Sequence, residues 1–451
     1  MNAINPATEE AVATYPDQTD RQVSQILHKA QDASREWRKT SLDHRATLLR
    51  KAAEILRKDL QQLARLITTE MGKPVAQSEA EVEKCAVGCE HYATHGAQYL
   101  ANEPVKTDAA ESYISYEPLG AVLAIMPWNF PFWQAIRFAA PTLMAGNVCL
   151  LKHAPNVPGS ALAIERIFRD AGFPSGTFTP LLVDTPAVES IINHPAISAV
   201  TLTGSSRAGM AVAAQAGKAL KKCVLELGGS DPFIVLPDAD LPSTANSAVS
   251  ARTLNSGQSC IAAKRFIVVG DSRPFAKAMA DVMSRLKVGD PTDRATDVGP
   301  IARRDLLEHL ETQVERSIAA GAKPLVGGHP IAGKGFYYAP TVLADVKPGM
   351  PAFDEEIFGP VAAVISAKDV DEAIDLANQT EYGLGASLWT RDTALAKKLA
   401  PRIQSGSVFI NGIVKSDPRL PFGGVKHSGY GRELSRQGIL EFVNVKTVWV
   451  R

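Results

Sequence analysis

The residues best suited to chemistry in this chain are a cysteine and a glutamate that both stand beside small residues. Cys260 follows the Gly- and Ser-containing turn 255–259, and Glu226 is followed within three residues by two glycines. A cysteine thiolate attacks electrophilic carbon, and it needs a local field that lowers the pKa of its thiol. A nearby carboxylate can accept a proton or activate a water molecule. The pair indicates covalent catalysis, whereas Cys149, inside an apolar run, fits the usual role of a small buried hydrophobe.

A second candidate group lies just after an apolar run. Asn129 stands in the motif Pro-Trp-Asn-Phe-Pro, directly after residues 121–126. Loops beyond the carboxyl ends of parallel strands bind ligands in α/β proteins. An asparagine amide held there can donate a hydrogen bond to an oxyanion. An Asx turn before proline is the simpler alternative.

Three further motifs are compatible with a ligand that contains phosphate or ribose. Segment 203–209 follows an apolar strand and opens a helix, whose N-terminus favours a phosphate. It lacks the G-x-G-x-x-G fingerprint, and the steric needs of the turn explain its glycines equally well. Lys152 ends another strand, where it either meets a ribose or phosphate or remains a solvated charge. Glu355 and Glu356 precede Phe358, a pattern that gains meaning only beside the other motifs.

The composition excludes several classes of partner. The chain has 451 residues with 48 basic and 48 acidic side chains, so no net field favours nucleic acid or an anionic membrane. Five scattered cysteines do not form a disulfide framework, which fits a reducing, cytoplasmic compartment. No signal peptide is apparent, and no apolar stretch reaches the ~18 residues of a membrane span. No metal site is expected, because Cys85, Cys89, His91 and His95 do not share one helix face.

The order of the predicted elements indicates two α/β domains. Residues 19–100 show helical periodicity, and from residue 113 onward apolar strand-like runs alternate with helical segments, which predicts parallel sheets. The predicted strands are 113–116, 121–126, 148–151, 199–203, 266–269 and 361–365, and the helices that follow them are 159–171, 207–222, 274–287 and 369–378. Cys260 then lies near the boundary between the domains, a usual place for an active-site cleft. The alternating tail 442–450 predicts an edge strand that pairs with another subunit.

Six motifs in a fixed order resemble the aldehyde dehydrogenase superfamily along essentially the whole chain. They are Pro-Trp-Asn-Phe-Pro at 127–131, Thr-Gly-Ser at 203–205, Glu-Leu-Gly-Gly at 226–229, Gly-Gln-Ser-Cys at 257–260, Glu-Glu-Ile-Phe-Gly-Pro at 355–360 and Pro-Phe-Gly-Gly at 421–424. Within the superfamily the chain most resembles succinate-semialdehyde dehydrogenases of the bacterial and cyanobacterial type. That likeness is carried by Pro-Trp-Asn-Phe-Pro-Phe-Trp-Gln, Leu-Lys-His-Ala, Glu-Leu-Gly-Gly-Ser-Asp-Pro-Phe and Lys-Ser-Asp-Pro-Arg-Leu-Pro-Phe-Gly-Gly.

The resemblance implies an aldehyde dehydrogenase-like α/β fold with two parallel-sheet domains and a small β oligomerisation element. The dinucleotide-binding domain would comprise residues 1–110 and 119–228, and the catalytic domain residues 229–440. Residues 111–118 and 441–451 would form the oligomerisation element. A homodimer or homotetramer is expected.

The resemblance also implies the roles of individual residues. Cys260 would be the nucleophile and Glu226 the general base, and Asn129 with the backbone N–H of Cys260 would form the oxyanion hole. The cofactor, NAD or NADP, would contact Trp128, Lys152, Pro155, Gly204, Ser205, Gly209, Leu227, Glu356 and Phe358. Lys152 would meet the adenosine ribose, Gly204 and Ser205 the pyrophosphate, and Glu356 the nicotinamide ribose. The substrate would contact Arg137, Trp133, Ser259, Ser416 and Arg419, with Arg137 binding a carboxylate; a helix-surface charge is the alternative for Arg137.

The chain departs from the family pattern at three positions. Pro155 stands where many NAD-preferring relatives have a glutamate that repels a 2′-phosphate, so NADP becomes possible. Ser230 stands where most relatives have lysine. Leu254 stands where some relatives have a second arginine, which leaves Ser416 and Arg419 as candidates for the missing donor.

The expected activity is NAD(P)-dependent oxidation of succinic semialdehyde to succinate through a thiohemiacetal and a thioester on Cys260. A broad-specificity aliphatic aldehyde dehydrogenase, or one for another semialdehyde, is the first alternative. A relative that passes its acyl group to coenzyme A is disfavoured by Glu226, which would then be superfluous. A non-catalytic structural homologue of the crystallin type is disfavoured because Cys260, Glu226 and Asn129 occur together.

Overall fold

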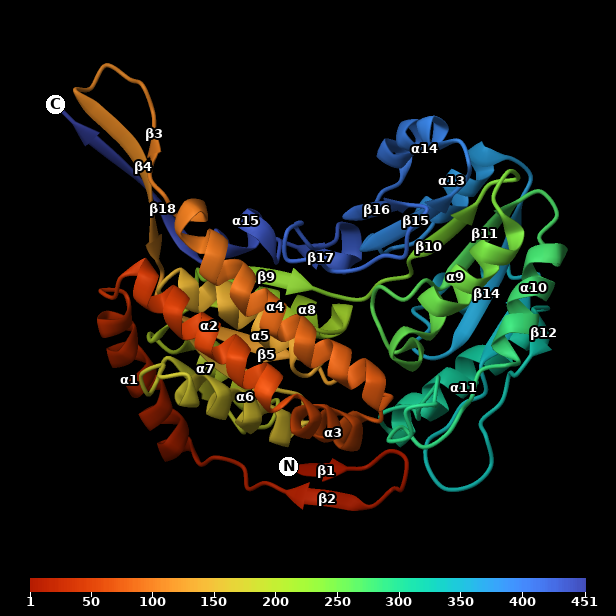
Figure 1. Cartoon of the computed structure of the whole chain (residues 1–451), viewed down its shortest axis with the longest axis horizontal. Coiled ribbons are helices and arrows are strands. Elements are labelled where there is room, and N and C mark those ends of the chain that lie inside the picture. The colour runs from red at the N-terminus through yellow and green to blue at the C-terminus, as the bar shows by residue number, and fades with distance from the viewer.

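The first half of the chain builds a six-stranded sheet flanked by long helices. The computed structural model describes all residues from 1 to 451. Figure 1 shows this first unit mostly in red to yellow, beside a second unit in green to blue. The strand order is β17-β9-β8-β5-β6-β7, parallel except for β17. The strands are β5 (Ala121–Met126), β6 (Val148–His153), β7 (Phe178–Pro180), β8 (Ile197–Thr203), β9 (Lys222–Glu226) and β17 (Gly429–Tyr430). β5 and β6 are almost wholly buried, as their continuous apolar runs predict.

Nine helices cover this sheet, and local capping explains where several of them begin. Thr19, Ser41 and Ser205 each accept a backbone N–H from the first turn of their helix. The helices are α1 (Asp20–Trp37), α2 (Leu42–Lys58), α3 (Leu60–Met71), α4 (Val75–Tyr99), α5 (Trp133–Met144), α6 (Pro158–Asp170), α7 (Ala187–Asn193), α8 (Ser206–Lys218) and α15 (Ser435–Ile439). α5 is buried along its whole length, so the side chains that it carries toward the site are fixed by packing.

A second parallel sheet follows in the chain and carries its own core. Its strand order is β12-β13-β14-β11-β10-β15-β16, and only β12 runs antiparallel to its neighbour. The strands are β10 (Pro232–Val235), β11 (Arg265–Val269), β12 (Lys323–Val326), β13 (Thr341–Ala344), β14 (Val361–Ala367), β15 (Gly385–Trp389) and β16 (Ser407–Ile410). The helices are α9 (Leu241–Thr253), α10 (Arg273–Met283), α11 (Arg304–Ala319), α12 (Pro351–Asp354), α13 (Val370–Asn378) and α14 (Thr393–Leu399). The expected α/β class is confirmed.

A β arm projects from the first unit (Figure 1). It has the strand order β18-β4-β3, formed by β3 (Glu103–Pro104), β4 (Glu111–Pro118) and β18 (Val443–Val450). β18 pairs with β4 antiparallel over eight residues, from Val443 opposite Pro118 to Val450 opposite Glu111. β18 has one unpaired edge, and Val445, Trp449 and Val450 are exposed on it.

Two features differ from the sequence-based expectation. The N-terminus forms a small hairpin of β1 (Asn2–Ile4) and β2 (Ala11–Thr14), which no apolar periodicity indicated. Part of the interval 229–440 returns to the first unit, because β17 joins the first sheet and Phe422 belongs to the first core. No helix of the structure is long and apolar enough to cross a membrane.

Candidate active site

The turn before Cys260 has an unusual backbone. Asn255, Ser256 and Gly257 take φ values of +54°, +55° and +76°, which is one left-handed turn. The glycine is required at its position, because an added Cβ would lie 2.2 Å from the carbonyl oxygen of Gly359. The turn therefore packs its backbone directly against the loop that carries the paired acids.

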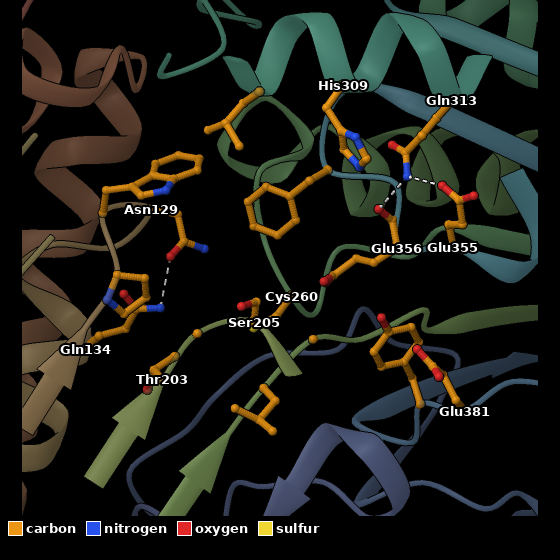
Figure 2. Close-up of a pocket in the computed structure, with 18 of the residues that line it drawn as sticks. Asn129, Gln134, Thr203, Ser205, Cys260, His309, Gln313, Glu355, Glu356 and Glu381 are labelled. Carbon is orange, nitrogen blue, oxygen red and sulfur yellow. Dashed lines mark hydrogen bonds between the residues drawn. The ribbon is translucent and has the colours of Figure 1, made fainter. Parts of the chain in front are cut away.

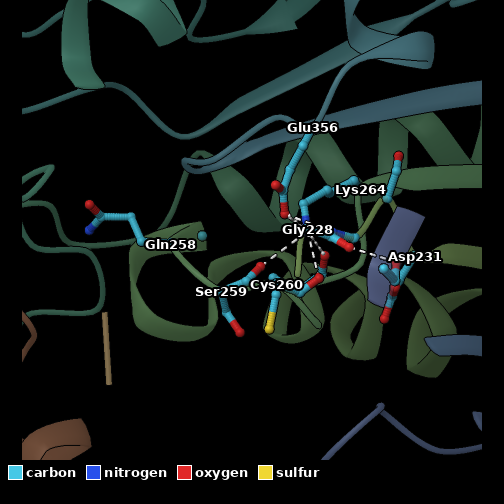
Figure 3. A network of polar contacts seen from close by, with 12 residues as sticks. Gly228, Asp231, Gln258, Ser259, Cys260, Lys264 and Glu356 are labelled. Atoms are coloured by element: carbon cyan, nitrogen blue, oxygen red, sulfur yellow. Dashed lines mark hydrogen bonds and ion pairs between the residues drawn. The ribbon is translucent and has the colours of Figure 1, made fainter. Parts of the chain in front are cut away.

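A buried lysine holds the segment on the other side of Cys260. The Lys264 ammonium donates to the carbonyl oxygens of Ser259, Cys260 and Ala262 at 3.1, 2.8 and 3.2 Å. It also lies 3.7 Å from a carboxylate oxygen of Glu356, and Figure 3 shows this network. Sequence reasoning missed Lys264, although a lysine at the start of a buried strand is itself unusual.

The thiol of Cys260 is not activated by its surroundings in this structure. Burial raises its pKa to about 12, against smaller opposing effects of Lys264 and Arg137. The expectation of a local field that lowers this pKa is wrong for the protein alone, because desolvation outweighs the two cations. At neutral pH the raised pKa favours the thiol over the thiolate.

Three hydrogen bonds hold Asn129, two at its side-chain amide and one at its backbone carbonyl oxygen. Its Oδ1 accepts from Gln134 Nε2 at 3.1 Å, and its Nδ2 donates to the carbonyl oxygen of Gln258 at 3.1 Å. Asn255 Nδ2 donates to the Asn129 carbonyl at 2.7 Å. An amide Nδ2 carries two hydrogens, so one remains to be donated to a ligand. Gln134 was not predicted from the sequence; it lies in the first turn of α5, five residues after Asn129.

A cavity of about 510 Å³ opens on one side of Cys260. Figure 2 shows Asn129, Ser205, Cys260 and Glu356 around it, and the lining comes from both α/β units. Of the predicted residues, Trp128, Asn129, Gly204, Ser205, Leu227, Cys260, Glu356 and Phe358 line it. Lys152, Pro155, Gly209 and Glu226 do not line it. The structure adds His309 and Gln313 of α11, which no sequence motif indicated.

The residues of this cavity fit a dinucleotide. Gly204 and Ser205 line it at the N-terminus of α8, where free backbone N–H groups favour a phosphate. An added Cβ at Gly228 would lie 2.6 Å from Glu356 Oε2, so a larger residue there would displace this carboxylate. Glu356 accepts from the backbone N–H of Gly229 at 2.9 Å, which holds its carboxylate where a ribose hydroxyl can donate to it.

A second cavity of about 230 Å³ lies on the other side of Cys260. Four of the predicted substrate residues line it, namely Trp133, Arg137, Ser259 and Ser416. The fifth, Arg419, is exposed outside it and forms a bidentate pair with Asp417 at 2.8 and 2.6 Å. Glu81, Lys84 and Lys415 also line this cavity, and sequence reasoning missed all three.

Arg137 is buried rather than a helix-surface charge. Its side chain is 4% exposed and forms an ion pair with the equally buried Glu433. Its guanidinium lies 4.8 Å from the ring centroid of Phe422. The charge that Arg137 brings to the cavity is therefore already balanced by a carboxylate.

Glu226 lies in the same buried network. It is 2% exposed, and neither of its carboxylate oxygens has a hydrogen-bond partner. Burial raises the pKa of Glu226 well above its usual range, and the neighbouring Glu433 adds to that shift. A carboxyl with a raised pKa and no hydrogen-bond partner is suited to exchange a proton with a ligand or a water molecule.

Glu81 ties α4 to the start of α5. Its Oε1 accepts the backbone N–H groups of Phe132 and Trp133 at 2.9 and 3.0 Å, and the buried Lys73 pairs with it. The carboxylate thus satisfies N–H groups that the first turn of a helix leaves free. This contact fixes the direction in which α5 enters the site.

Comparison with known proteins gives one consistent result over the whole chain. The model of the aldehyde dehydrogenase family matches residues 1–448. A probable succinate-semialdehyde dehydrogenase [NADP(+)] of Synechocystis is 52% identical over 448 residues, 99% of each chain. The succinate semialdehyde dehydrogenase [NAD(P)+] of Escherichia coli is 50% identical over 99% of this chain and 97% of its own. The crystal structure of succinic semialdehyde dehydrogenase from Streptococcus pyogenes with NADP+ superimposes with a TM-score of 0.97 at 36% identity, over 100% of this chain and 99% of that one.

Proposed function

Because this chain belongs to the aldehyde dehydrogenase family, we propose that it oxidises succinic semialdehyde to succinate with NADP+ or NAD+. The observation that carries the proposal is the place of Cys260 between two cavities. The larger cavity offers a helix N-terminus and the Glu356 carboxylate, and the smaller offers Arg137 and Ser416. The relatives described above are named as succinate-semialdehyde dehydrogenases. The names of the Synechocystis and Escherichia coli proteins also give NADP(+) and NAD(P)+ as cofactors.

In the first step the Cys260 thiol gives its proton to a water molecule, and the thiolate sulfur adds to the aldehyde carbon to give a thiohemiacetal. The aldehyde oxygen gains the electron pair of its C=O bond and becomes an oxyanion. Asn129 Nδ2 and the backbone N–H of Cys260 donate to that oxygen, and Gln134 and Gln258 keep the amide in the donating orientation. The backbone of Cys260 is held meanwhile by Lys264.

A bound nicotinamide dinucleotide supplies the hydride acceptor and, in its oxidised form, a positively charged ring. The chain's own residues place the thiohemiacetal carbon at the junction of the two cavities. Loss of hydride from that carbon leaves a thioester on Cys260. Glu226, as the carboxylate, then takes a proton from the water molecule that attacks the thioester. The C–S bond breaks, Cys260 leaves as the thiolate, and succinate is released.

One assay tests the proposal against its alternatives. NAD(P)H formation is measured with succinic semialdehyde and with butanal, each with and without coenzyme A. We expect at least tenfold higher kcat/KM for succinic semialdehyde and no stimulation by coenzyme A. Equal rates with butanal would indicate a broad-specificity enzyme, and dependence on coenzyme A would indicate acyl transfer.

The remaining site and assembly assignments also belong to the proposal. Lys152 and Pro155 are assigned to the adenosine ribose beyond the larger cavity, and the chain is assigned to a cytoplasmic homodimer or homotetramer. Five free cysteines support a reducing compartment. The exposed apolar edge of β18 supports pairing with a second copy of the chain.

A further inference from the structure

Three cations line the smaller cavity, and two of them, Lys84 and the exposed Lys415, have no carboxylate within ion-pair distance. Lys84, on α4, lines the cavity together with Arg137 and Ser416. Arg137 is paired with Glu433, whereas no carboxylate lies within ion-pair distance of Lys84. Lys415 lies at the solvent-exposed rim, so Lys84 is the unpaired cation that an anion meets inside the cavity. An unpaired charge in a largely desolvated place is costly unless a ligand satisfies it.

The contacts of Lys84 orient a second donor. Its Nζ donates to Ser416 Oγ at 2.7 Å, and the indole Nε1 of Trp133 donates to the same oxygen at 3.0 Å. Lys84 Nζ also lies 4.5 Å from the ring centroid of Trp133. Since the Ser416 oxygen accepts two hydrogen bonds, its own hydroxyl hydrogen is left to donate. No group of the protein accepts that hydrogen.

We propose that Lys84, acting directly and through Ser416, binds the carboxylate of the substrate and determines specificity for aldehydes with a terminal carboxylate. This inference rests on the proposed oxidation of succinic semialdehyde. Arg137 then contributes less than Lys84 to binding of the substrate carboxylate, because Arg137 is already paired with Glu433. Leu254, which stands where some relatives have a second arginine, also lines this cavity. In this chain Lys84 of α4 supplies the second cation instead.

The titration of Lys84 offers a signature that a purely structural lysine lacks. Burial, and to a smaller extent the charge of Arg137, lower its pKa to about 8, while Cys85, Glu81 and Asp417 oppose the shift. The ammonium is therefore charged below about pH 8 and neutral above it. Carboxylate binding should weaken as pH rises through that value.

The test compares Lys84→Met with the wild-type enzyme on succinic semialdehyde and on butanal. Methionine keeps an unbranched apolar side chain over Trp133 and removes the charge together with the hydrogen bond to Ser416. A charge-assisted hydrogen bond of the usual strength corresponds to a ten- to hundredfold loss of kcat/KM. We expect that loss with succinic semialdehyde, mainly through KM, and a change of less than threefold with butanal. Equal losses on both aldehydes, or no loss, would overturn the assignment while leaving the semialdehyde activity standing.

Two further variants sharpen the result. Lys84→Arg keeps its charge at high pH, so its KM for succinic semialdehyde should stay low above pH 8, where that of the wild type rises. Lys415→Met removes a lysine charge from the exposed rim of the same cavity, so it should cost much less than Lys84→Met. A similar loss of kcat/KM in both variants would indicate that a general positive electrostatic field attracts the substrate, rather than direct contact with Lys84. If the wild-type enzyme shows no preference for succinic semialdehyde over butanal, the proposed substrate itself fails.

Discussion

At the scale of single residues, the protonation state of Cys260 decides when the enzyme is reactive. Burial raises the pKa of its thiol to about 12. Iodoacetamide reacts with the thiolate, so alkylation of Cys260 in the cofactor-free protein should be slow at pH 7 and rise about tenfold per pH unit up to pH 10. Mass spectrometry of the Cys260 peptide measures the rate.

The denatured protein provides the matched control for that measurement. In the unfolded chain the same thiol has a pKa of about 8.5, so its alkylation rate should level off above pH 9. A native rate that already levels off near pH 7 would show that the folded site generates a thiolate unaided.

The sequence predicted many of the residues that line the two cavities because they lie in recognisable motifs. Cys260, Asn129 and Glu356 can be found by type and local pattern. Lys84 and Gln134 could not, because each depends on which face of a buried helix meets the cavity. That face is set by tertiary contacts such as those of Glu81 with the start of α5.

At the scale of elements, the left-handed turn before Cys260 has a backbone conformation that is unfavourable for residues other than glycine. Gly257→Ala should destabilise the protein by about 2 kcal/mol or more, since it adds left-handed strain to a clash with Gly359. It should also lower kcat, because the turn positions Cys260. Thermal unfolding and steady-state kinetics measure the two effects.

Gly270→Ala is the control for strain alone. Gly270 has a φ of +91°, but nothing lies within 4 Å of an added Cβ. It should cost only about 1 kcal/mol and leave kcat unchanged. Equal effects of the two substitutions would mean that contact with Gly359 does not constrain the turn.

Periodicity predicted most of the long elements but could not assign every segment to its sheet. The continuous apolar runs that form β5, β8, β11 and β14 indicate buried strands, because both faces of a parallel sheet are covered by helices. β17 has two residues and joins a sheet whose other strands end about two hundred residues earlier. A strand so short carries no period, so only tertiary contacts define it.

At the scale of the whole molecule, the β arm should join subunits. Val445→Lys combined with Trp449→Lys places two charges on the exposed apolar strand β18, so pairing between copies should weaken. We expect the wild-type protein to elute as a dimer or tetramer and the double variant to shift toward monomer in light-scattering measurements. A wild-type monomer at micromolar concentration, or an unchanged assembly in the variant, would contradict this role of the arm.

The central claim, that succinic semialdehyde is oxidised through a covalent adduct on Cys260, is tested most directly by trapping the thioester. In Glu226→Gln, addition and hydride loss should proceed while hydrolysis slows. Mixing this variant with succinic semialdehyde and NADP+ should therefore give a burst of NADPH, and mass spectrometry should find one succinyl group on the Cys260 peptide. Cys260→Ala should give neither signal. Normal turnover of Glu226→Gln without any label on Cys260, or activity in Cys260→Ala, would contradict the account.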